Sequence, residues 1–322
     1  MKALVLDRYG PPSQVLSLQE VDRPVPGPRD VLVRVRAAGV DPGVWHLVRG
    51  EAYVGRLVLG LRRPRRQVVG QDVAGIVEEV GSDVRRFSPG DEVFAQAEGT
   101  FAEYVCIGED VMEHKPSRLT LEEAAAVPLS ANTALLALRD VARLQPGQAA
   151  LVIGASGGVG TFAVQIAATY GAHVTAVCGP GGAGLVRALG ADHVIDYTTE
   201  DVVRVGTRYD VILDLAGSHS VSGLRKMLTA KGALVLCSGN GGRWFGPVGR
   251  IIVARLLSPF VRQELRTFLA RPGRQNLATL KELIHSGQLR PIIDSTYPLT
   301  EAVEAIRHVE EGHPQGKVVI SI

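Results

Sequence analysis

The sequence of 322 residues is poor in cysteine and nearly neutral in charge. Cys106, Cys178 and Cys237 show no CxxC spacing and lie in or beside apolar segments, which argues against a disulfide framework. We expect three reduced, buried, structural thiols, as is typical of a cytoplasmic protein. A formal net charge of +2 is too balanced for a nucleic-acid-binding protein.

Long apolar runs are also absent. The first ten residues, MKALVLDRYG, reach charged side chains after four apolar ones, so they lack the apolar core of a signal peptide. No run approaches the length that spans a membrane. The chain nevertheless has 46% hydrophobic residues, enough at this length to bury two cores. We therefore expect a cytoplasmic protein with two folded parts.

Four glycines, by contrast, lie close together in one short stretch. Residues 152–160 read VIGASGGVG and contain Gly154, Gly157, Gly158 and Gly160. An apolar run precedes these glycines and apolar residues at helical spacing follow them, so they occupy a strand-to-helix turn. Such a turn brings backbone close to a ligand and aims the unpaired N–H groups of a helix start at it, where the helix dipole favours negative charge. A pyrophosphate suits this geometry, although a tight turn without a ligand explains the same glycines.

A repeated pattern of strands and helices surrounds the turn. Buried parallel strands are predicted at 149–153, 173–177, 193–195, 209–213 and 233–237, with helical segments near 185–189, 199–205 and 221–228. Right-handed connections of this kind build a doubly wound sheet, whose ligands lie at the carboxyl ends of the strands near the topological switch point. The fold class is therefore α/β, and a nucleotide is the expected ligand.

The two ends of the chain have a different pattern, with short strand-like runs separated by turn residues. Short strand-like runs at 31–35 and 73–80 are separated by turn residues such as Pro89-Gly90, which is typical of a β-barrel or sandwich. The C-terminal residues show the same pattern, and we predict a helix at 299–309 and a closing strand at 317–322 there. We predict a discontinuous domain of residues 1–126 and 287–322, interrupted by a nucleotide-binding domain of residues 127–286.

These segments together resemble a known family. The order of GVDPGVWHLVRG, VVGQDVAGIVEEVGSDVRRFSPGDEVFA, GTFAEYV, LVIGASGGVGTFAVQIAATYGA, ALGADHVIDY and GKVVISI is similar to that of the medium-chain dehydrogenase/reductase superfamily, and most similar to its quinone oxidoreductase-like branch. The resemblance implies a GroES-like β-barrel catalytic domain, split between the chain ends, and a central Rossmann domain with a doubly wound parallel sheet. It also implies hydride transfer with a nicotinamide cofactor, and a homodimer.

Catalytic zinc, which the alcohol dehydrogenases of this superfamily hold, is not expected here. Zinc needs Cys, His or carboxylate ligands and an open position. The position of the family's GHE motif reads Gly70-Gln71-Asp72, the position of a cysteine ligand reads Asp41, and glutamine is a poor zinc ligand. Without a metal, hydride can pass to a quinone or to the β-carbon of an enone, where charge spreads onto oxygen by conjugation, and the cofactor carries most of the chemistry.

Asp41 and Tyr53 are the candidate catalytic residues. Asp41 replaces an asparagine that faces the cleft in the quinone reductase relatives, but it also fits as the N-cap of a short helix that has proline at N1 and ends at Gly50. Tyr53 offers a phenol to the substrate oxygen, but an ordinary tyrosine at a barrel edge explains it as well.

Cofactor identity depends on the end of the second Rossmann strand, where an acidic residue binds the ribose diol of NAD. Cys178 is followed there by GPGGAG, which holds neither an acid nor the basic residue of the NADPH-dependent relatives. The resemblance places Tyr197 beside the 2′-phosphate, and Arg187 reaches in from the next helix unless it lies on a solvated helix face. NADPH is favoured, with NADH as the alternative, because no acid repels the phosphate. The residues expected to bind the cofactor are Gly154, Ser156, Gly157, Gly158, Val159, Gly160, Gly179, Arg187, Tyr197, Ala216, Ser238 and Gly239.

Two further segments, 56–66 and 243–274, are rich in arginine. They are predicted to be a solvated loop and a lid or subunit-contact helix, with peripheral attachment to anionic lipid as the alternative. The predicted function is NADPH-dependent, zinc-independent reduction of small quinones or α,β-unsaturated carbonyl compounds. A zinc-free alcohol dehydrogenase and a low-turnover NADPH-binding sensor or structural protein are the alternatives, because the chemistry needs no diagnostic side chain.

Overall fold

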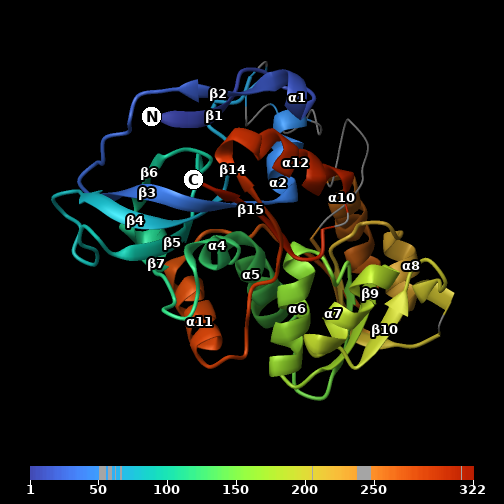
Figure 1. Cartoon of the computed structure of the whole chain (residues 1–322). Helices are drawn as coiled ribbons and strands as arrows, with labels where there is room; N and C mark the ends of the chain where they lie inside the picture. Colours follow the sequence, from blue (N-terminus) through green and yellow to red (C-terminus); the bar gives the residue numbers. More distant parts are fainter. Residues whose placement is uncertain are drawn as a thin grey trace. The chain divides into compact units, whose positions relative to one another are not determined.

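The computed structural model describes the whole chain except residues 51–55, 57–59, 62, 66, 205, 238–247 and 313. The described residues form two compact units (Figure 1). The first unit contains Met1–Gly50, Gly55–Asn132 and Arg271–Ile322, and the second contains Thr133–Ala270. The first unit thus begins the chain, is interrupted, and resumes at residue 271 instead of the predicted residue 287.

Helix α11 (Arg274–His285) accounts for the earlier return to the first unit. Its apolar face buries Leu277, Leu280 and Ile284. At its C-terminal end, the carbonyl of His285 accepts a 2.7 Å hydrogen bond from Arg118 of the same unit. Because the helix is amphipathic, its apolar face is stable only when it packs against other apolar residues, and it packs within the first unit.

The second unit is built on a six-stranded parallel sheet. The strands lie in the order β10-β9-β8-β11-β12-β13, and every neighbouring pair is parallel. The chain passes from β8 outward to β9 and β10, and then returns to the other side of β8 for β11, so the carboxyl end of β8 is the topological switch point. The strands are β8 (Ala149–Ile153), β9 (His173–Cys178), β10 (His193–Asp196), β11 (Tyr209–Asp214), β12 (Leu228–Leu236) and β13 (Glu264–Thr267).

The apolar runs predicted as buried strands therefore form this sheet. Leu151, Ile153, Val177, Ile212 and Leu234 share one hydrophobic core. The strands are apolar along their whole length because helices cover a parallel sheet on both faces.

Short helices connect or flank these strands. The described helices are α6 (Gly158–Thr169), α7 (Ala183–Ala188), α8 (Val221–Lys226) and α10 (Val248–Leu257), with a π-helical turn η3 (Leu136–Val141) and the 3-10 turns η4 (Pro180–Gly182), η5 (Val202–Arg204) and η6 (Ser258–Phe260). The predicted helix at 199–205 is wrong, because its described part forms only η5. Asp201 accepts a 3.0 Å hydrogen bond from the N–H of Val203, and Thr199 donates to the carbonyl of Asp196, so local side-chain bonds compete with the helix.

The first unit contains a seven-stranded sheet around the long strand β3. The order is β14-β15-β3-β4-β5-β7, with β6 also paired to β3, and β1 pairs separately with β2. The C-terminal strand β15 is antiparallel to β3, with Val318 opposite Val40. The strands are β1 (Lys2–Leu6), β2 (Leu16–Glu20), β3 (Asp30–Val40), β4 (Asp72–Val80), β5 (Glu92–Gln96), β6 (Tyr104–Gly108), β7 (Met112–His114), β14 (Ile293–Pro298) and β15 (Lys317–Ser321).

Helices α2 and α12 cover one end of this sheet. Val44 and Val48 of α2 and Ile306 and Val309 of α12 lie in one core cluster. Because α2 follows β3 directly, this packing fixes the position of Asp41 between the strand and the helix. The helical elements of the unit are α1 (Pro12–Val15), α2 (Pro42–Arg49), η2 (Glu109–Val111), α4 (Leu121–Ala125), α5 (Pro128–Leu135), which begins here, α11, η7 (Leu299–Glu301) and α12 (Ala302–Glu311).

Candidate functional site

The glycine turn lies at the switch point between β8 and α6. Gly154 has a φ of +83°, a left-handed conformation that favours glycine. The N–H groups of Gly154 and Ala155 both donate to the carbonyl of Val177 at 3.0 Å, which holds the turn against the end of β9. The N-cap residue of α6 is Gly157, which has no side chain to bond the first N–H groups of the helix. The turn therefore leaves an open helix N-terminus, a geometry that suits an anion.

Two of the glycines have different roles. A Cβ on Gly160 would lie 2.1 Å from the carbonyl oxygen of Gly154 and 2.6 Å from that of Ala155, so glycine is needed there for α6 to pack against the turn. Gly157 has φ −80° and ψ 179°, which any residue adopts. A Cβ on Gly157 would find the carbonyl oxygen of Gly154 as its nearest described neighbour, at 3.6 Å. Its missing side chain leaves a space in front of the helix, as a phosphate cradle requires.

The loop after β9 lies directly beside this turn. A Cβ on Gly182 would lie 2.6 Å from the Cβ of Ser156, so this loop and the glycine turn are in contact. The Tyr197 hydroxyl lies 3.2 Å from the position that a Cβ on Gly179 would take. The N–H of Tyr197 also donates to the carbonyl of Cys178 at 3.2 Å, and the tyrosine is 51% exposed. Ser156, Gly179 and Tyr197 are thus brought together, and their contact with a cofactor stays a prediction.

Arg187 and Asp196 are the charged residues near this loop. Arg187 is exposed on α7. Burial and the Asp196 carboxylate raise the pKa of the Cys178 thiol, whereas Arg187 lowers it, so both charges act at the end of β9. The sequence analysis missed Asp196, which ends β10 opposite Cys178. Its Oδ1 accepts hydrogen bonds of 2.9 and 2.7 Å from the N–H and hydroxyl of Thr198, which hold the carboxylate in its own turn.

The end of β11 carries a buried ion pair that the sequence did not reveal. Asp214 is fully buried; its Oδ2 accepts a 2.6 Å hydrogen bond from Arg250 of α10, and its Oδ1 accepts one of 2.9 Å from the N–H of Gly217. These bonds fix the loop in which the N atom of Ala216 lies 3.5 Å from the position of a Cβ on Gly154. Ala216 therefore borders the glycine turn, and its contact with a cofactor stays a prediction. Ser238 and Gly239 lie outside the described residues.

Asp41 precedes α2, but its carboxylate does not cap the helix. Its Oδ1 accepts hydrogen bonds of 2.5 Å from the Lys317 ammonium and 3.0 Å from the Ser130 hydroxyl. The interpretation of this side chain as a helix cap is wrong, because a buried ammonium is a stronger donor than a backbone N–H group. The helix itself is confirmed, and it ends at Gly50 with a φ of +57°. Tyr53, the other candidate catalytic residue, lies outside the described residues.

The side chains near Asp41 do not suit a zinc ion. In the part of the chain that the structure describes, no three His, Cys, Asp or Glu side chains are grouped so as to hold a metal. The carboxylates of Asp41 and Asp72 both bind the Lys317 ammonium, and Gln71 beside them is a weak zinc ligand. An ammonium in contact with both acids opposes a divalent cation there.

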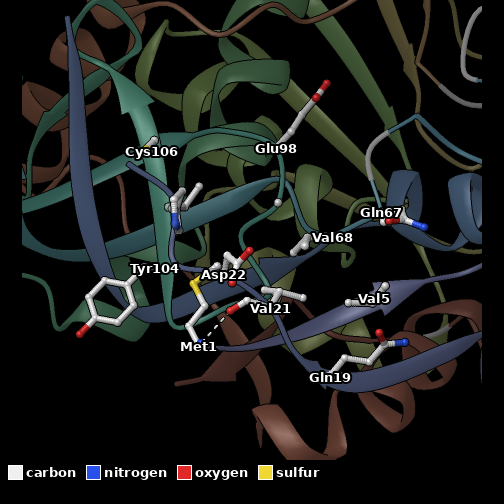
Figure 2. A pocket seen from close by; sticks show the side chains of 13 residues that line it. Met1, Val5, Gln19, Val21, Asp22, Gln67, Val68, Glu98, Tyr104 and Cys106 are labelled. Carbon is white, nitrogen blue, oxygen red and sulfur yellow. Dashed lines mark hydrogen bonds between the residues drawn. The ribbon is translucent and has the colours of Figure 1, made fainter. Parts of the chain in front are cut away.

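A separate cavity of about 520 Å³ in the first unit is lined by residues of β1, β2 and β6 (Figure 2). Figure 2 shows the amino group of Met1 at its edge, which donates a 2.8 Å hydrogen bond to the carbonyl of Val21. Burial, together with the carboxylates of Asp30 and Glu79, raises the pKa of the Cys106 thiol to about 11, so this lining thiol is protonated at neutral pH. None of the predicted site residues that the structure describes lines the cavity.

The two basic segments differ in their structure. In the first, Arg56 is more than a solvated side chain, because its guanidinium lies 4.5 Å from the centre of the Tyr9 ring and donates to the carbonyl of Gly50 at 2.8 Å. In the second, α10 exposes apolar side chains, among them Leu256 at 67%. A lid or subunit contact, with lipid attachment as the alternative, stays the prediction for this segment. No helix in the described ranges is both long enough and apolar enough to cross a bilayer.

Comparisons with known proteins agree with this geometry. A family model described as alcohol dehydrogenase GroES-like domain matches residues 27–117, and one described as zinc-binding dehydrogenase matches residues 189–320. The chain is 34% identical to NAD(P)H oxidoreductase RTN4IP1, mitochondrial, of Mus musculus, over 100% of this chain and 89% of that protein. It is 32% identical to quinone-oxidoreductase QR1, chloroplastic, of Triphysaria versicolor, over 99% of this chain and 98% of that protein. The structure of the quinone oxidoreductase from Coxiella burnetii matches with a TM-score of 0.87 and 29% identity, over 100% of this chain and 99% of that one.

The fold and the glycine turn define a nicotinamide-dependent oxidoreductase with a GroES-like unit and a parallel Rossmann sheet. The chain belongs to the medium-chain dehydrogenase/reductase superfamily, and its relatives include quinone oxidoreductases. The predicted fold class and family are confirmed. The zinc in one family description is not matched by the donor set around Asp41.

Proposed function

We propose that this oxidoreductase uses NADPH, without zinc, to reduce quinones or α,β-unsaturated carbonyl compounds. The observation that carries the cofactor choice is the loop after β9, where the Tyr197 hydroxyl lies beside Gly179 and residues 178–184 contain no acid. A carboxylate at that point would bind the ribose diol of NAD and repel the 2′-phosphate of NADP. Arg187, exposed on α7, supplies the positive charge toward that phosphate.

The residues of the second unit would hold the cofactor through its phosphates. The N-terminus of α6 and the space beside Gly157 receive the pyrophosphate. The Asp214–Arg250 pair keeps the loop with Ala216 in place beside Gly154. The nicotinamide supplies a hydride when the cofactor is bound, and the protein contributes orientation and exclusion of water.

The donor set and the relatives support the proposed substrate class. A simple carbonyl needs a metal or an acid to polarise it, whereas a quinone or enone spreads the incoming charge by conjugation. The residues around Asp41 do not fit zinc, and curated relatives at 32–34% identity are named as quinone and NAD(P)H oxidoreductases. Two electrons arrive as the hydride, and one proton from solvent completes the reduced product.

The decisive experiment measures oxidation of NADPH and of NADH by the purified protein against a panel of quinones, enones and aldehydes. We expect turnover with NADPH and quinones or enones. Turnover with aldehydes alone would replace this proposal with a zinc-free alcohol dehydrogenase. Tight NADPH binding without turnover of any compound would replace it with a sensor or structural protein. Sedimentation of the same sample tests the predicted homodimer. The predicted location of the protein remains the cytoplasm.

A further inference from the structure

Three charged side chains meet in the interior of the first unit. The Lys317 ammonium donates to Asp41 Oδ1 at 2.5 Å and to Asp72 Oδ2 at 3.1 Å. The three residues are 2%, 4% and 0% exposed, respectively. Asp41 follows β3, Asp72 begins β4 and Lys317 begins β15, three strands that neighbour one another in Figure 1. The cluster therefore joins segments up to 276 residues apart in the sequence.

One carboxylate oxygen of the cluster has no hydrogen-bond donor among the described residues. The Ser130 hydroxyl donates to Asp41 Oδ1 at 3.0 Å, and the N–H of Leu129 donates to Asp72 Oδ1 at 2.7 Å. Asp41 Oδ2 is buried and has no donor among the described residues. The two carboxyl groups bind the same ammonium, so the two acids lie close together in the interior. The oxygen of Asp41 that has no partner requires a donor, and a proton held between the two acids supplies one, because a protonated carboxyl group donates whereas an ionised one only accepts.

The charges of the cluster lead to the same requirement. Two carboxylates and one ammonium leave a net negative charge in the buried interior, and an uncompensated buried charge is strongly unfavourable. The charges that act on each member are those of the other two. Ionised groups on the surrounding elements have other partners: Arg49 of α2 pairs with Glu310 of α12, Glu123 of α4 accepts from the N–H of Thr120, and Asp294 of β14 pairs with His308.

We propose that Asp41, Asp72 and Lys317 form a proton-binding site, in which the two carboxyl groups share one proton at neutral pH while Lys317 keeps its positive charge. The proton resides mainly on Asp72, from which it is donated toward Asp41. Burial and the adjacent Asp41 carboxylate raise the pKa of Asp72 well above its ordinary value. Burial acts in the same direction on Asp41, but the Lys317 ammonium and hydrogen bonds from its neighbours bring the pKa of Asp41 below its ordinary value. This proposal depends on neither the cofactor nor the substrate.

The shared proton makes the stability of the first unit depend on pH. An unfolded aspartate loses its proton near pH 4, at about its ordinary pKa, whereas folded Asp72 keeps it to higher pH. The contribution of Asp72 is therefore complete below about pH 4 and is lost as the pH rises toward the folded pKa. The lowered pKa of Asp41 makes the stability depend on pH in a more acidic range. The raised pKa of Lys317 does so in a more alkaline range. Between these limits, Asp72 dominates the change.

Asp72→Asn provides the test, because asparagine has the shape of a protonated aspartate and no proton to lose. We would measure urea unfolding between about pH 5 and 8, together with hydrogen exchange of the β4 and β15 peptides. The unfolding constant of the wild type, divided by that of D72N, should rise about tenfold per pH unit up to the folded pKa. The exposed Asp83→Asn variant is the matched control, and its ratio should stay flat.

Infrared spectroscopy detects the proton directly. At neutral pH the wild type and D83N should show a carboxylic-acid C=O stretching band that is absent from D72N. Asp41→Asn should lose the band too, because Asp72 alone then forms a balanced pair with Lys317. If D72N does not fold, the acid band of the wild type and its loss in D41N still test whether the two carboxyl groups share a proton. A wild type without an acid band at neutral pH, or a flat stability ratio for a folded D72N, overturns the proposal.

Discussion

Replacing Gly157 by leucine should abolish NADPH binding while the second unit stays folded. The backbone of Gly157, with φ −80° and ψ 179°, accepts any side chain. The nearest described atom to a new Cβ is the carbonyl oxygen of Gly154 at 3.6 Å, an ordinary contact. The added side chain would therefore extend into the space in front of α6, which the pyrophosphate needs, without displacing the turn.

The expected magnitudes differ sharply between binding and stability. A charge-assisted hydrogen bond from backbone N–H to phosphate contributes about 1.5–3 kcal/mol, so losing two of them weakens binding by about two to four powers of ten. Replacing glycine where the conformation is compatible changes the free energy of unfolding by about 0.4–1 kcal/mol, in the stabilising direction. The melting temperature should therefore move by only a few degrees, about 2–4 °C per kcal/mol for a unit of this size.

Gly160→Ala is the matched control for this experiment. Its Cβ would lie 2.1 Å from the carbonyl oxygen of Gly154, so α6 has to move away from the turn. Overpacking of this kind costs about 1–3 kcal/mol, and this variant should lose stability even without a ligand. Calorimetric titration with NADPH and thermal unfolding of the free proteins measure both effects. Wild-type affinity in a folded G157L variant would refute the assignment of the turn to the cofactor, and an unchanged melting temperature for G160A would refute the packing argument.

Three further predictions concern the phosphate, the metal and a buried ion pair. Arg187→Ala should weaken NADPH about 10- to 100-fold and leave NADH nearly unchanged in binding titrations, and an equal loss for both cofactors would exclude contact with the 2′-phosphate. Metal analysis should find no stoichiometric zinc and chelators should not inhibit, because Lys317 binds both nearby acids; one zinc per chain would contradict this. Arg250→Met should destabilise the chain by about 3–5 kcal/mol in thermal unfolding, because buried Asp214 loses its partner, and adding Asp214→Asn should restore part of that loss.

The sequence alone was sufficient for features that depend on neighbouring residues. The run at 149–153 is apolar on both faces, and it forms β8 because a parallel strand is covered on both sides. The glycines that follow it predict a turn, and Gly154 has the left-handed φ that such a turn requires. The short helix ending at Gly50 follows from proline at its start and glycine at its end in the same way. The prediction of a helix at residues 199–205 was wrong, because local side-chain hydrogen bonds replaced the expected helix.

The tertiary structure decided which polar groups meet. Asp41 has every local feature of a helix N-cap, yet it binds Lys317, 276 residues away, because β15 lies beside β3 in the folded sheet. Asp214 likewise meets Arg250 only through the packing of α10. Local patterns determine backbone conformation, since turns and amphipathic faces depend on adjacent residues. The partner of a buried charge depends on strand order and helix packing, and no spacing in the sequence records these.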